Sequence, residues 1–580
     1  MKKSILNILL LLISIIVSFT LSLKMNNYER FDYALPNSLI PIFLLISTFI
    51  LCKKSLTNKN VRLKQTSFIV SLIFAIMIVI GNCLYCNLEL ISIITNGIVL
   101  IKSVLYFIST LTISYVLILN IYTGLDKIKF TKWNIPDSIY TYLIIWLLII
   151  FAWIPYFLSC YPGILTPDPI LQIEQIIGLQ EITNNYPIIH TLLIKFCLNV
   201  ASLFGNYTTG IGLYSIIQMI IMSFIFTITI RWMVKNNFNS RLILFALGFY
   251  ALYPVNAFYS VTVWKDIIYS VLILLFFILV YSIIQKEDQF KNYIIFFIVI
   301  VGCTLFRNNG FLVIIPVLLI LIFKLKNNRK PLSISLICLV SFLLLWISSL
   351  NFIFKIPTTS TIDAFSVPLQ QVARIYVKNG DTLTKHEIKL IDKYFNTNIK
   401  DYYNPQVSDA VKDNFKLDEY KNDKLSFITL WIKLVFKHPI ISLESFLYNN
   451  YGYWYPKSQH WVVARGIIDS EKNWQIQNGP HEKPLINGSF VDIIQNFIDN
   501  RKIPIIPMLY SLGFLTWIIL IMMAYTIYKK ERKTFLSYTP IIFVFINCIF
   551  SPVWAEFRYY YPIIVCLPVI MAIATKNHKT

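Results

Sequence analysis

Long runs of apolar residues alternate with short polar loops along most of the chain. Many runs reach the roughly 18 residues that a helix needs to cross the hydrocarbon core of a bilayer. This pattern predicts an all-α polytopic membrane protein with about fourteen transmembrane helices, and not a membrane β-barrel, whose strands would alternate residue by residue. The expected helices lie near 4–23, 38–52, 66–86, 98–122, 138–158, 211–231, 242–260, 267–284, 292–306, 311–324, 332–354, 503–527, 535–551 and 561–575.

The apolar run 188–204 does not fit a simple series of crossings. With about 17 residues it lies at the lower limit for a span. A full crossing would also place the loop around Arg231, Lys235 and Arg241 on the opposite side from the other basic loops. We therefore expect a re-entrant or interfacial helix here, with a full span as the alternative.

Charge is concentrated in a few loops. Only 14% of the residues are charged, against about 25% in soluble proteins, yet the net charge is +22. Cytoplasmic loops of membrane proteins carry an excess of Lys and Arg, so this charge indicates orientation and not a nucleic-acid partner. We expect a cell-membrane protein with both termini in the cytoplasm. The basic clusters lie within 53–64, 126–137, 324–330 and 529–533.

A polar stretch interrupts the apolar pattern between 355 and 502. It holds 16 of the 29 acidic residues and 19 basic residues, a nearly balanced composition. Its apolar positions follow an amphipathic helical pattern, so we expect a small, mainly helical extracytoplasmic domain. The predicted organisation is N-terminal transmembrane helices at 1–137, a transmembrane core at 138–354 with a first large outer loop at 159–187, the soluble domain at 355–502, and C-terminal transmembrane helices at 503–580.

Asp168 is the predicted catalytic residue. It lies in the segment YPGILTPD, directly after the apolar run 138–158, where a span would meet water. An unpaired carboxylate near hydrocarbon is costly, so such a residue suggests a function. A carboxylate placed beside a hydroxyl can act as the general base that deprotonates it. Gln172 and Glu174 follow at short helical spacing and are expected to face the same cavity. The alternative is an exposed aspartate that caps a helix.

Further charged residues fall on the same predicted face and suggest a phosphate site. Arginine binds phosphate through a planar fork, and lysine binds it as a point charge. The alternatives are snorkelling and ion pairs between helices, or for the histidine a proton shared with the aspartate or a neutral structural role. A His/Asp metal site is possible although the sequence lacks a dense ligand cluster, so the requirement for a divalent metal stays open. The residues expected in the site are His190, Lys265, Asp266, Arg307 and Arg558.

The polar domain contains an aromatic run from Tyr448 to Tyr455, followed by Trp461 and Trp474. Aromatic rings with polar groups can stack on sugar faces, and they also form belts at membrane interfaces, so two roles are open. A second polar cluster, 370–374, lies near the start of the domain and is a candidate to face the cavity.

These motifs resemble the GT-C superfamily of multi-pass glycosyltransferases, which includes protein O-mannosyltransferases and aminoarabinose transferases, and more closely a Gram-positive bacterial branch. The resemblance implies a GT-C-like core and a polyprenyl-phosphate-linked sugar donor used on the extracytoplasmic face. It also implies a cell-envelope glycan, lipid or protein as acceptor, with Asp168 as general base. The motifs are YPGILTPDPILQ, YPIIHT, VWKD, FRNNG, VPLQQVAR and FRYYYP, between 161 and 562.

Two other functions are compatible with the sequence. A transporter or flippase of lipid-linked sugars would use the same charged residues to line a path, and a non-catalytic envelope-assembly protein would use them for packing. A transporter is expected to place its binding residues near the bilayer midplane, whereas these residues gather at one membrane face. The sequence therefore favours the glycosyltransferase.

Overall fold

The structure is a computed structural model of the whole chain. It describes residues 2–23, 39–134, 136–203, 206–285, 292–357, 365–396, 398–458, 460–463, 465–466, 480–500 and 505–576. The regular elements within these ranges are helices, and three isolated β-bridges occur between other segments. The prediction of an all-α membrane protein is thereby confirmed in its class.

Eight helices of the described residues are long and apolar enough to span a membrane, and ten segments are if each of two bent helix pairs counts as one span. The larger number of about fourteen spans stays a prediction. One bent pair, α10 (Ser240–Leu252) and α11 (Pro254–Ser260), turns by 50°. The eight are α1 (Lys2–Leu21), α3 (Val61–Tyr85), α5 (Gly97–Leu125), α6 (Ile139–Ser159), α9 (Tyr207–Lys235), α12 (Lys265–Gln285), α15 (Arg329–Ser348) continued by η2 (Ser349–Ile353), and α28 (Phe557–Thr575).

Several predicted spans are helices of fewer than 18 residues in the structure. The polar break after Phe306 leaves 14 residues in α13 (Tyr293–Phe306) and 14 in α14 (Phe311–Lys324), separated by η1 (Asn308–Gly310). At about 1.5 Å per residue, such a helix is about 21 Å long, shorter than the roughly 30 Å of the hydrocarbon core. Other short apolar helices are α2 (Ile40–Leu56), α8 (Ile188–Ser202), α25 (Leu512–Tyr528) and α27 (Thr539–Ile549).

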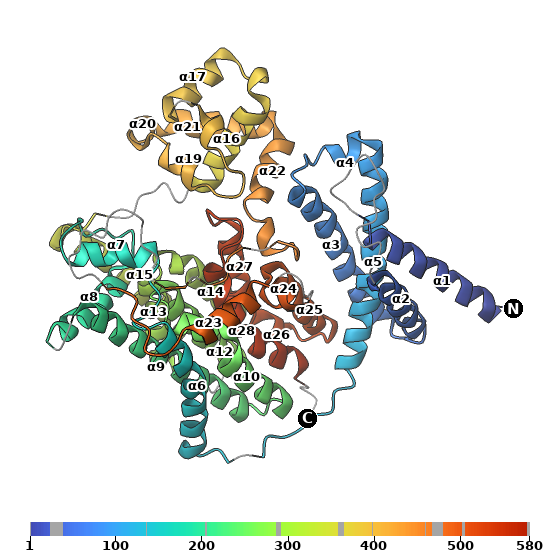
Figure 1. Cartoon of the computed structure of the whole chain (residues 1–580), viewed down its shortest axis with the longest axis horizontal. Helices are drawn as coiled ribbons and strands as arrows, with labels where there is room; N and C mark the ends of the chain where they lie inside the picture. Colours follow the sequence, from blue (N-terminus) through green and yellow to red (C-terminus); the bar gives the residue numbers. More distant parts are fainter. Residues whose placement is uncertain are drawn as a thin grey trace.

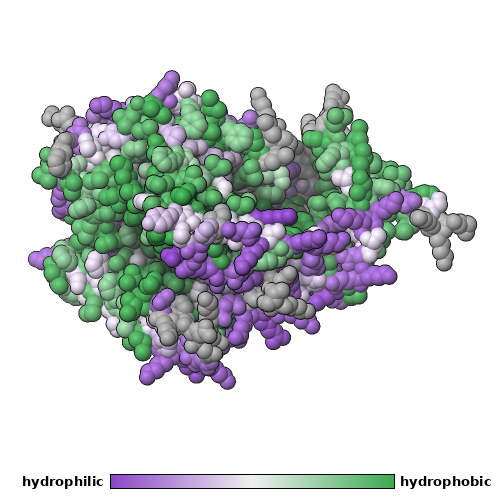
Figure 2. Space-filling model, turned by 90° about the horizontal axis from the view of Figure 1, so that it is seen from below, coloured by the Kyte–Doolittle hydropathy of each residue, from purple (hydrophilic) through white to green (hydrophobic). Residues whose placement is uncertain are grey.

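The apolar surface of the helical body matches a lipid environment. On α6, Ile144, Leu148 and Phe151 have more than half of their surface exposed. Figure 2 shows broad areas of apolar residues on the face seen there. Because apolar surface of this extent is costly in water, these faces are expected to contact lipid.

A separate helical layer, the outer helical layer, lies above the transmembrane body in Figure 1. It has its own hydrophobic core, which includes Leu369, Tyr394 and Phe427. This agrees with the predicted helical character of the polar stretch, while the predicted domain limits stay untested. Its helices are α16 (Ser366–Asn379), η4 (Gly380–Thr382), α17 (Lys385–Tyr394), α18 (Ile399–Tyr402), α19 (Asp409–Asp413), α20 (Leu417–Asn422), α21 (Lys424–Lys437) and α22 (Pro439–Tyr448).

The aromatic run after α22 returns to the main body. Tyr451, Tyr453 and Trp454 are buried in the main hydrophobic core, where Trp517 Nε1 donates to the carbonyl of Trp454 at 2.8 Å. These rings pack inside the protein, so neither sugar stacking nor a membrane-interface belt describes them. The remaining short helices are α4 (Ser92–Thr95), α7 (Pro167–Ile176), η5 (Tyr451–Tyr453), α23 (Ser489–Ile498), α24 (Ile505–Tyr510) and α26 (Arg532–Leu536).

Candidate functional site

The charged residues predicted from the sequence lie where several helix ends meet. α28 packs beside α12, and α12 packs beside α13. Asp266 in the first turn of α12 pairs with Arg307, which follows the end of α13, so these ends lie at the same level. The short helix α7 places Asp168 in its first turn and reaches this level from the segment after α6.

The segment before α7 is fixed to the chain that leads into α12. The amide of Ile164 donates to the carbonyl of Val261 at 2.9 Å, and the amide of Val263 donates to the carbonyl of Ile164 at 3.0 Å. Gly163 has a φ of +150°, and a Cβ there would collide with the side chain of Ser215. Only glycine fits this turn without strain, and the turn brings Asp168 close to Lys265.

Asp168 is held by two cations. Its Oδ2 lies 2.8 Å from Arg558 Nη1 and 3.8 Å from Lys265 Nζ. The three side chains keep 28%, 16% and 19% of their surface, in the order Asp168, Arg558, Lys265, so solvent reaches the cluster. Burial raises the pKa of Asp168, but the charges of Arg558 and Lys265 outweigh it and leave that pKa below its ordinary value. The carboxylate is therefore ionised in the resting site.

A second ion pair lies beside this cluster. Arg307 Nη1 is 2.9 Å from Oδ1 of Asp266, whose side chain is buried. Arg307 and Arg558 both lie against the ring of Tyr559, at 4.8 and 5.1 Å from its centroid. Stacking on an aromatic face leaves the edge of a guanidinium group available for hydrogen bonds. The ring of Tyr559 thus holds both arginines close to one another.

Aromatic side chains also position the other cations of the cluster. Arg558 lies 5.3 Å from the ring centroid of Trp264, and Lys265 Nζ lies 4.7 Å from that of Tyr186. Trp461, which is 40% exposed, lies 5.8 Å from Trp264 between ring centroids. Arg558 and Lys265 thus each lie beside an aromatic ring. Trp474, the other tryptophan named after the aromatic run of the polar domain, lies outside the described residues.

The sequence prediction did not include Glu556 among the site residues. Its Oε1 lies 3.4 Å from Arg558 Nε, and its Oε2 lies 3.9 Å from His460 Nε2. Burial raises the pKa of Glu556 to about 7, although the charge of Arg558 opposes this shift. Its place two residues before Arg558, in the same polar interruption, was the available signal. Arg558 therefore contacts two carboxylates of different character.

His190 is fully buried. Its Nδ1 is 2.9 Å from Gln172 Oε1, and its Nε2 is 2.8 Å from the hydroxyl of Tyr214. Burial lowers the pKa of His190 to about 3, so the ring is neutral. Both ring nitrogens are engaged in protein hydrogen bonds, which fits the structural role among the alternatives for this residue.

The two polar residues that follow Asp168 have different surroundings. Gln172 is buried, and its Nε2 donates to Thr191 Oγ1 at 2.7 Å, so it joins α7 to α8. Glu174 accepts a hydrogen bond at 2.6 Å from Gln180, in the turn after α7. The side-chain contact of Glu174 is thus local, whereas Gln172 connects two helices.

The polar cluster 370–374 lies elsewhere. Arg374 pairs with Glu444 at 2.6 Å, and Glu444 also accepts from the amide of Leu90. These contacts join the outer helical layer to the N-terminal helices and do not involve Asp168. Among the described residues no three His, Cys, Asp or Glu side chains come together as a metal ligand set would, and the metal question stays open.

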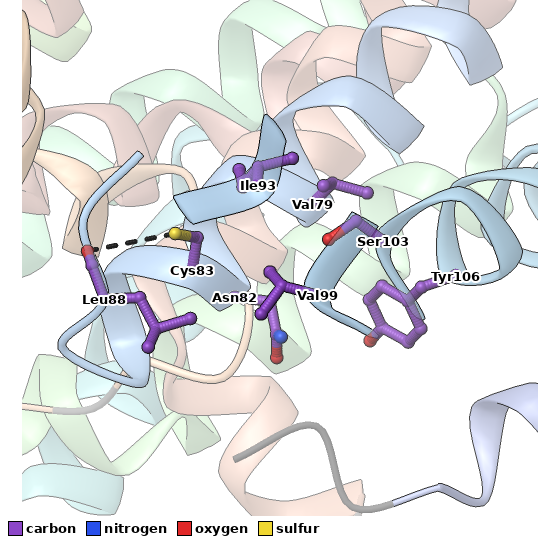
Figure 3. Close-up of a pocket in the computed structure, with 8 residues that line it drawn as sticks. All are labelled: Val79, Asn82, Cys83, Leu88, Ile93, Val99, Ser103 and Tyr106. Atoms are coloured by element: carbon purple, nitrogen blue, oxygen red, sulfur yellow. Dashed lines mark hydrogen bonds between the residues drawn. The ribbon is translucent and has the colours of Figure 1, made fainter. Parts of the chain in front are cut away.

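A small cavity near the N-terminal helices is unrelated to this cluster. Figure 3 shows it between α3, α4 and α5, with Cys83 Sγ directed at the carbonyl of Leu88 at 3.8 Å. Its volume of about 10 Å³ is room for about one water molecule. It offers no space for a substrate.

Residues 179–580 match a family described as "Family of unknown function (DUF6020)". The chain belongs to the DUF6020 family. The matched region includes His190, Lys265, Arg307 and Arg558 but begins after Asp168. Neither the curated proteins nor the solved structures give a match to this chain. In this DUF6020 protein, three cations and three carboxyl groups thus lie together at the helix ends.

Proposed function

We propose that this DUF6020 protein is a GT-C-type membrane glycosyltransferase. It moves a sugar from a polyprenyl-phosphate donor to a cell-envelope glycan, lipid or protein on the extracytoplasmic face. The observation that supports this function best is the solvent-reached carboxylate of Asp168, held by Arg558 at 2.8 Å and Lys265 at 3.8 Å. A base and phosphate-binding cations within one cluster are what a transfer from a lipid phosphate requires.

In this mechanism the donor phosphate takes Arg558 and Lys265 as its partners. Asp168 then loses the cations that lower its pKa, so it becomes a stronger base. Asp168 accepts the proton of the acceptor hydroxyl while the acceptor oxygen forms a bond to the anomeric carbon. The bond from that carbon to the phosphate oxygen breaks, and its electron pair stays on the lipid phosphate. The two cations stabilise the charge that develops there.

The distribution of basic residues supports an extracytoplasmic location for the site. Lys576 follows α28, whose first turn carries Arg558, and its Nζ lies 4.8 Å from the ring of Phe238 and 5.9 Å from that of Tyr281. The C-terminal ends of α9, α12 and α28 therefore lie together, away from the site. Basic residues at this end are typical of a cytoplasmic face.

The position of the cluster favours a transferase over a transporter. It lies at helix ends and keeps contact with solvent, whereas alternating access needs a site near the bilayer midplane. The outer helical layer stands above the transmembrane body in Figure 1, and in this proposal it contributes to the binding of the acceptor.

Mass spectrometry of envelope glycans and lipid-linked sugars tests the proposal. We compare the wild type, a deletion strain and Asp168→Asn, which keeps the size of the side chain but removes the base. A transferase predicts that one sugar disappears from a polymer in both mutants and that its polyprenyl-phosphate donor accumulates. Glycans that are altered in the deletion strain but normal in Asp168→Asn would contradict catalysis by Asp168 and favour transport or assembly.

A further inference from the structure

Arg558 lies between two carboxylates that differ in environment. Its Nη1 is 2.8 Å from Asp168 Oδ2, and its Nε is 3.4 Å from Glu556 Oε1. The side chain of Asp168 is 28% exposed, whereas that of Glu556 is only 5% exposed. One guanidinium group carries a single positive charge, so it cannot balance both carboxylates and a bound phosphate at once.

The carboxyl group of Glu556 is poorly stabilised as an anion. Its Oε1 is buried and accepts no hydrogen bond from the described residues, and its Oε2 is 3.9 Å from the nearest ring nitrogen of His460. A buried carboxylate without hydrogen bonds is costly, and protonation removes that cost. In agreement, burial raises the pKa of Glu556 to about 7. Both protonation states are therefore accessible near neutral pH.

Phosphate binding changes the balance between these states. A phosphodiester on Arg558 adds a negative charge near Glu556 and withdraws the cation that favours its ionised form. Resting on the proposed function, we propose that Glu556 is a positioning residue of the donor site that acts through Arg558. Above about pH 7 it is ionised in the free site and becomes protonated when Arg558 takes the lipid phosphate. Donor binding is thus coupled to the uptake of a proton.

The other groups around Glu556 do not account for a change in this pH range. Burial lowers the pKa of His460 below its ordinary value of 6.5, so its ring is neutral at pH values above 6.5. In the free site the pKa of Asp168 is below its ordinary value, and because phosphate binding withdraws the cations that lower it, proton uptake by Asp168 is distinguished from that by Glu556 with a variant that changes only Glu556. The charged and titratable groups that face Glu556 are Arg558 and Tyr559 of α28, His460, Asp266 of α12, Asp168 of α7, Asp409 of α19, Tyr453 of η5 and Tyr259 of α11.

The test measures binding of a phosphodiester that does not titrate itself. The full-length protein in detergent is titrated with farnesyl methyl phosphate between pH 6.0 and 8.5. The wild type is expected to bind with constant affinity below about pH 7 and to lose up to about tenfold per pH unit above it, because one proton must be taken up. Glu556→Gln is expected to bind with the same affinity across the whole range, since its amide stays neutral.

A matched control and a measurement on the wild type keep the result interpretable. Asp409→Asn removes another acidic group that faces Glu556, from a side chain that is 54% exposed, and is expected to keep the wild-type pH dependence. Calorimetry of the wild type in two buffers of different ionisation enthalpy counts protons directly and needs no variant.

The outcomes separate the two proposals. If the wild type binds the diester without proton uptake, or if Glu556→Gln keeps the wild-type slope, the role of Glu556 is overturned while the donor site stands. If neither the wild type nor Glu556→Gln binds the diester at any pH, the lipid-phosphate donor itself is refuted, and the role of Glu556 falls with it.

Discussion

At the scale of single residues, the shape of the Arg558 side chain matters as much as its charge. Its Nη1 contacts Asp168 and its Nε contacts Glu556, and a lysine has only one nitrogen for both positions. Arg558→Lys is therefore expected to lower transfer by about 10- to 100-fold, corresponding to a lost charged hydrogen bond of about 1.5–3 kcal/mol. The measurement is the cellular level of the accumulated lipid-linked donor. Arg329→Lys, at an exposed arginine in the opposite basic loop, is the matched control. Equal donor levels in both variants would contradict the prediction.

The sequence predicted which residues come together in this cluster better than it predicted the contacts among them. Residue type and the position of polar breaks indicated Asp168, Lys265 and Arg558, because a charge beside hydrocarbon needs a partner or a function. The direct contact between Asp168 and Arg558, 390 residues apart, cannot be read from spacing. Glu556 lies only two residues before Arg558, but the sequence does not show that its carboxyl group is buried beside that arginine. The neutral role of His190 also depended on burial, which the sequence does not specify.

At the scale of elements, the carboxylate of a buried ion pair within the outer helical layer also binds the segment between two N-terminal helices. Glu444 of α22 accepts from Arg374 of α16 at 2.6 Å and from the amide of Leu90, between α3 and α4. Glu444→Ala leaves Arg374 buried without its partner, so we expect a loss of about 3–5 kcal/mol in the free energy of unfolding. Thermal unfolding in detergent, supported by protease sensitivity of the outer layer, measures this effect.

A second ion pair across the same junction provides the control. Lys378 Nζ lies 3.0 Å from Glu89 Oε1, but both side chains are about half exposed. Lys378→Ala is expected to cost less than about 1 kcal/mol, as is usual for exposed pairs. Similar losses in the two variants would show that the Arg374–Glu444 pair does not hold the layer.

At the scale of the whole molecule, hydropathy predicted the class of fold but not the number of crossings. Runs such as 292–306 and 311–324 are apolar throughout, and the structure makes each a helix of 14 residues around the break at Arg307. Whether such a pair crosses or turns back depends on tertiary packing of the freed backbone groups. The buried aromatic run from Tyr451 shows the same limit, since its composition also fitted an exposed surface.

Orientation in the membrane is the property on which the proposed function depends most. Glu181 lies exposed in the predicted outer loop 159–187, and Lys127 lies exposed in the predicted cytoplasmic loop 126–137. Each is replaced by cysteine in a Cys338→Ser background, because Cys338 is the exposed natural cysteine of the described residues. An impermeant thiol reagent added to intact cells is expected to label Glu181→Cys and to label Lys127→Cys only after the cells are opened. The reverse pattern would place Asp168 in the cytoplasm, where a transfer to extracytoplasmic acceptors is impossible.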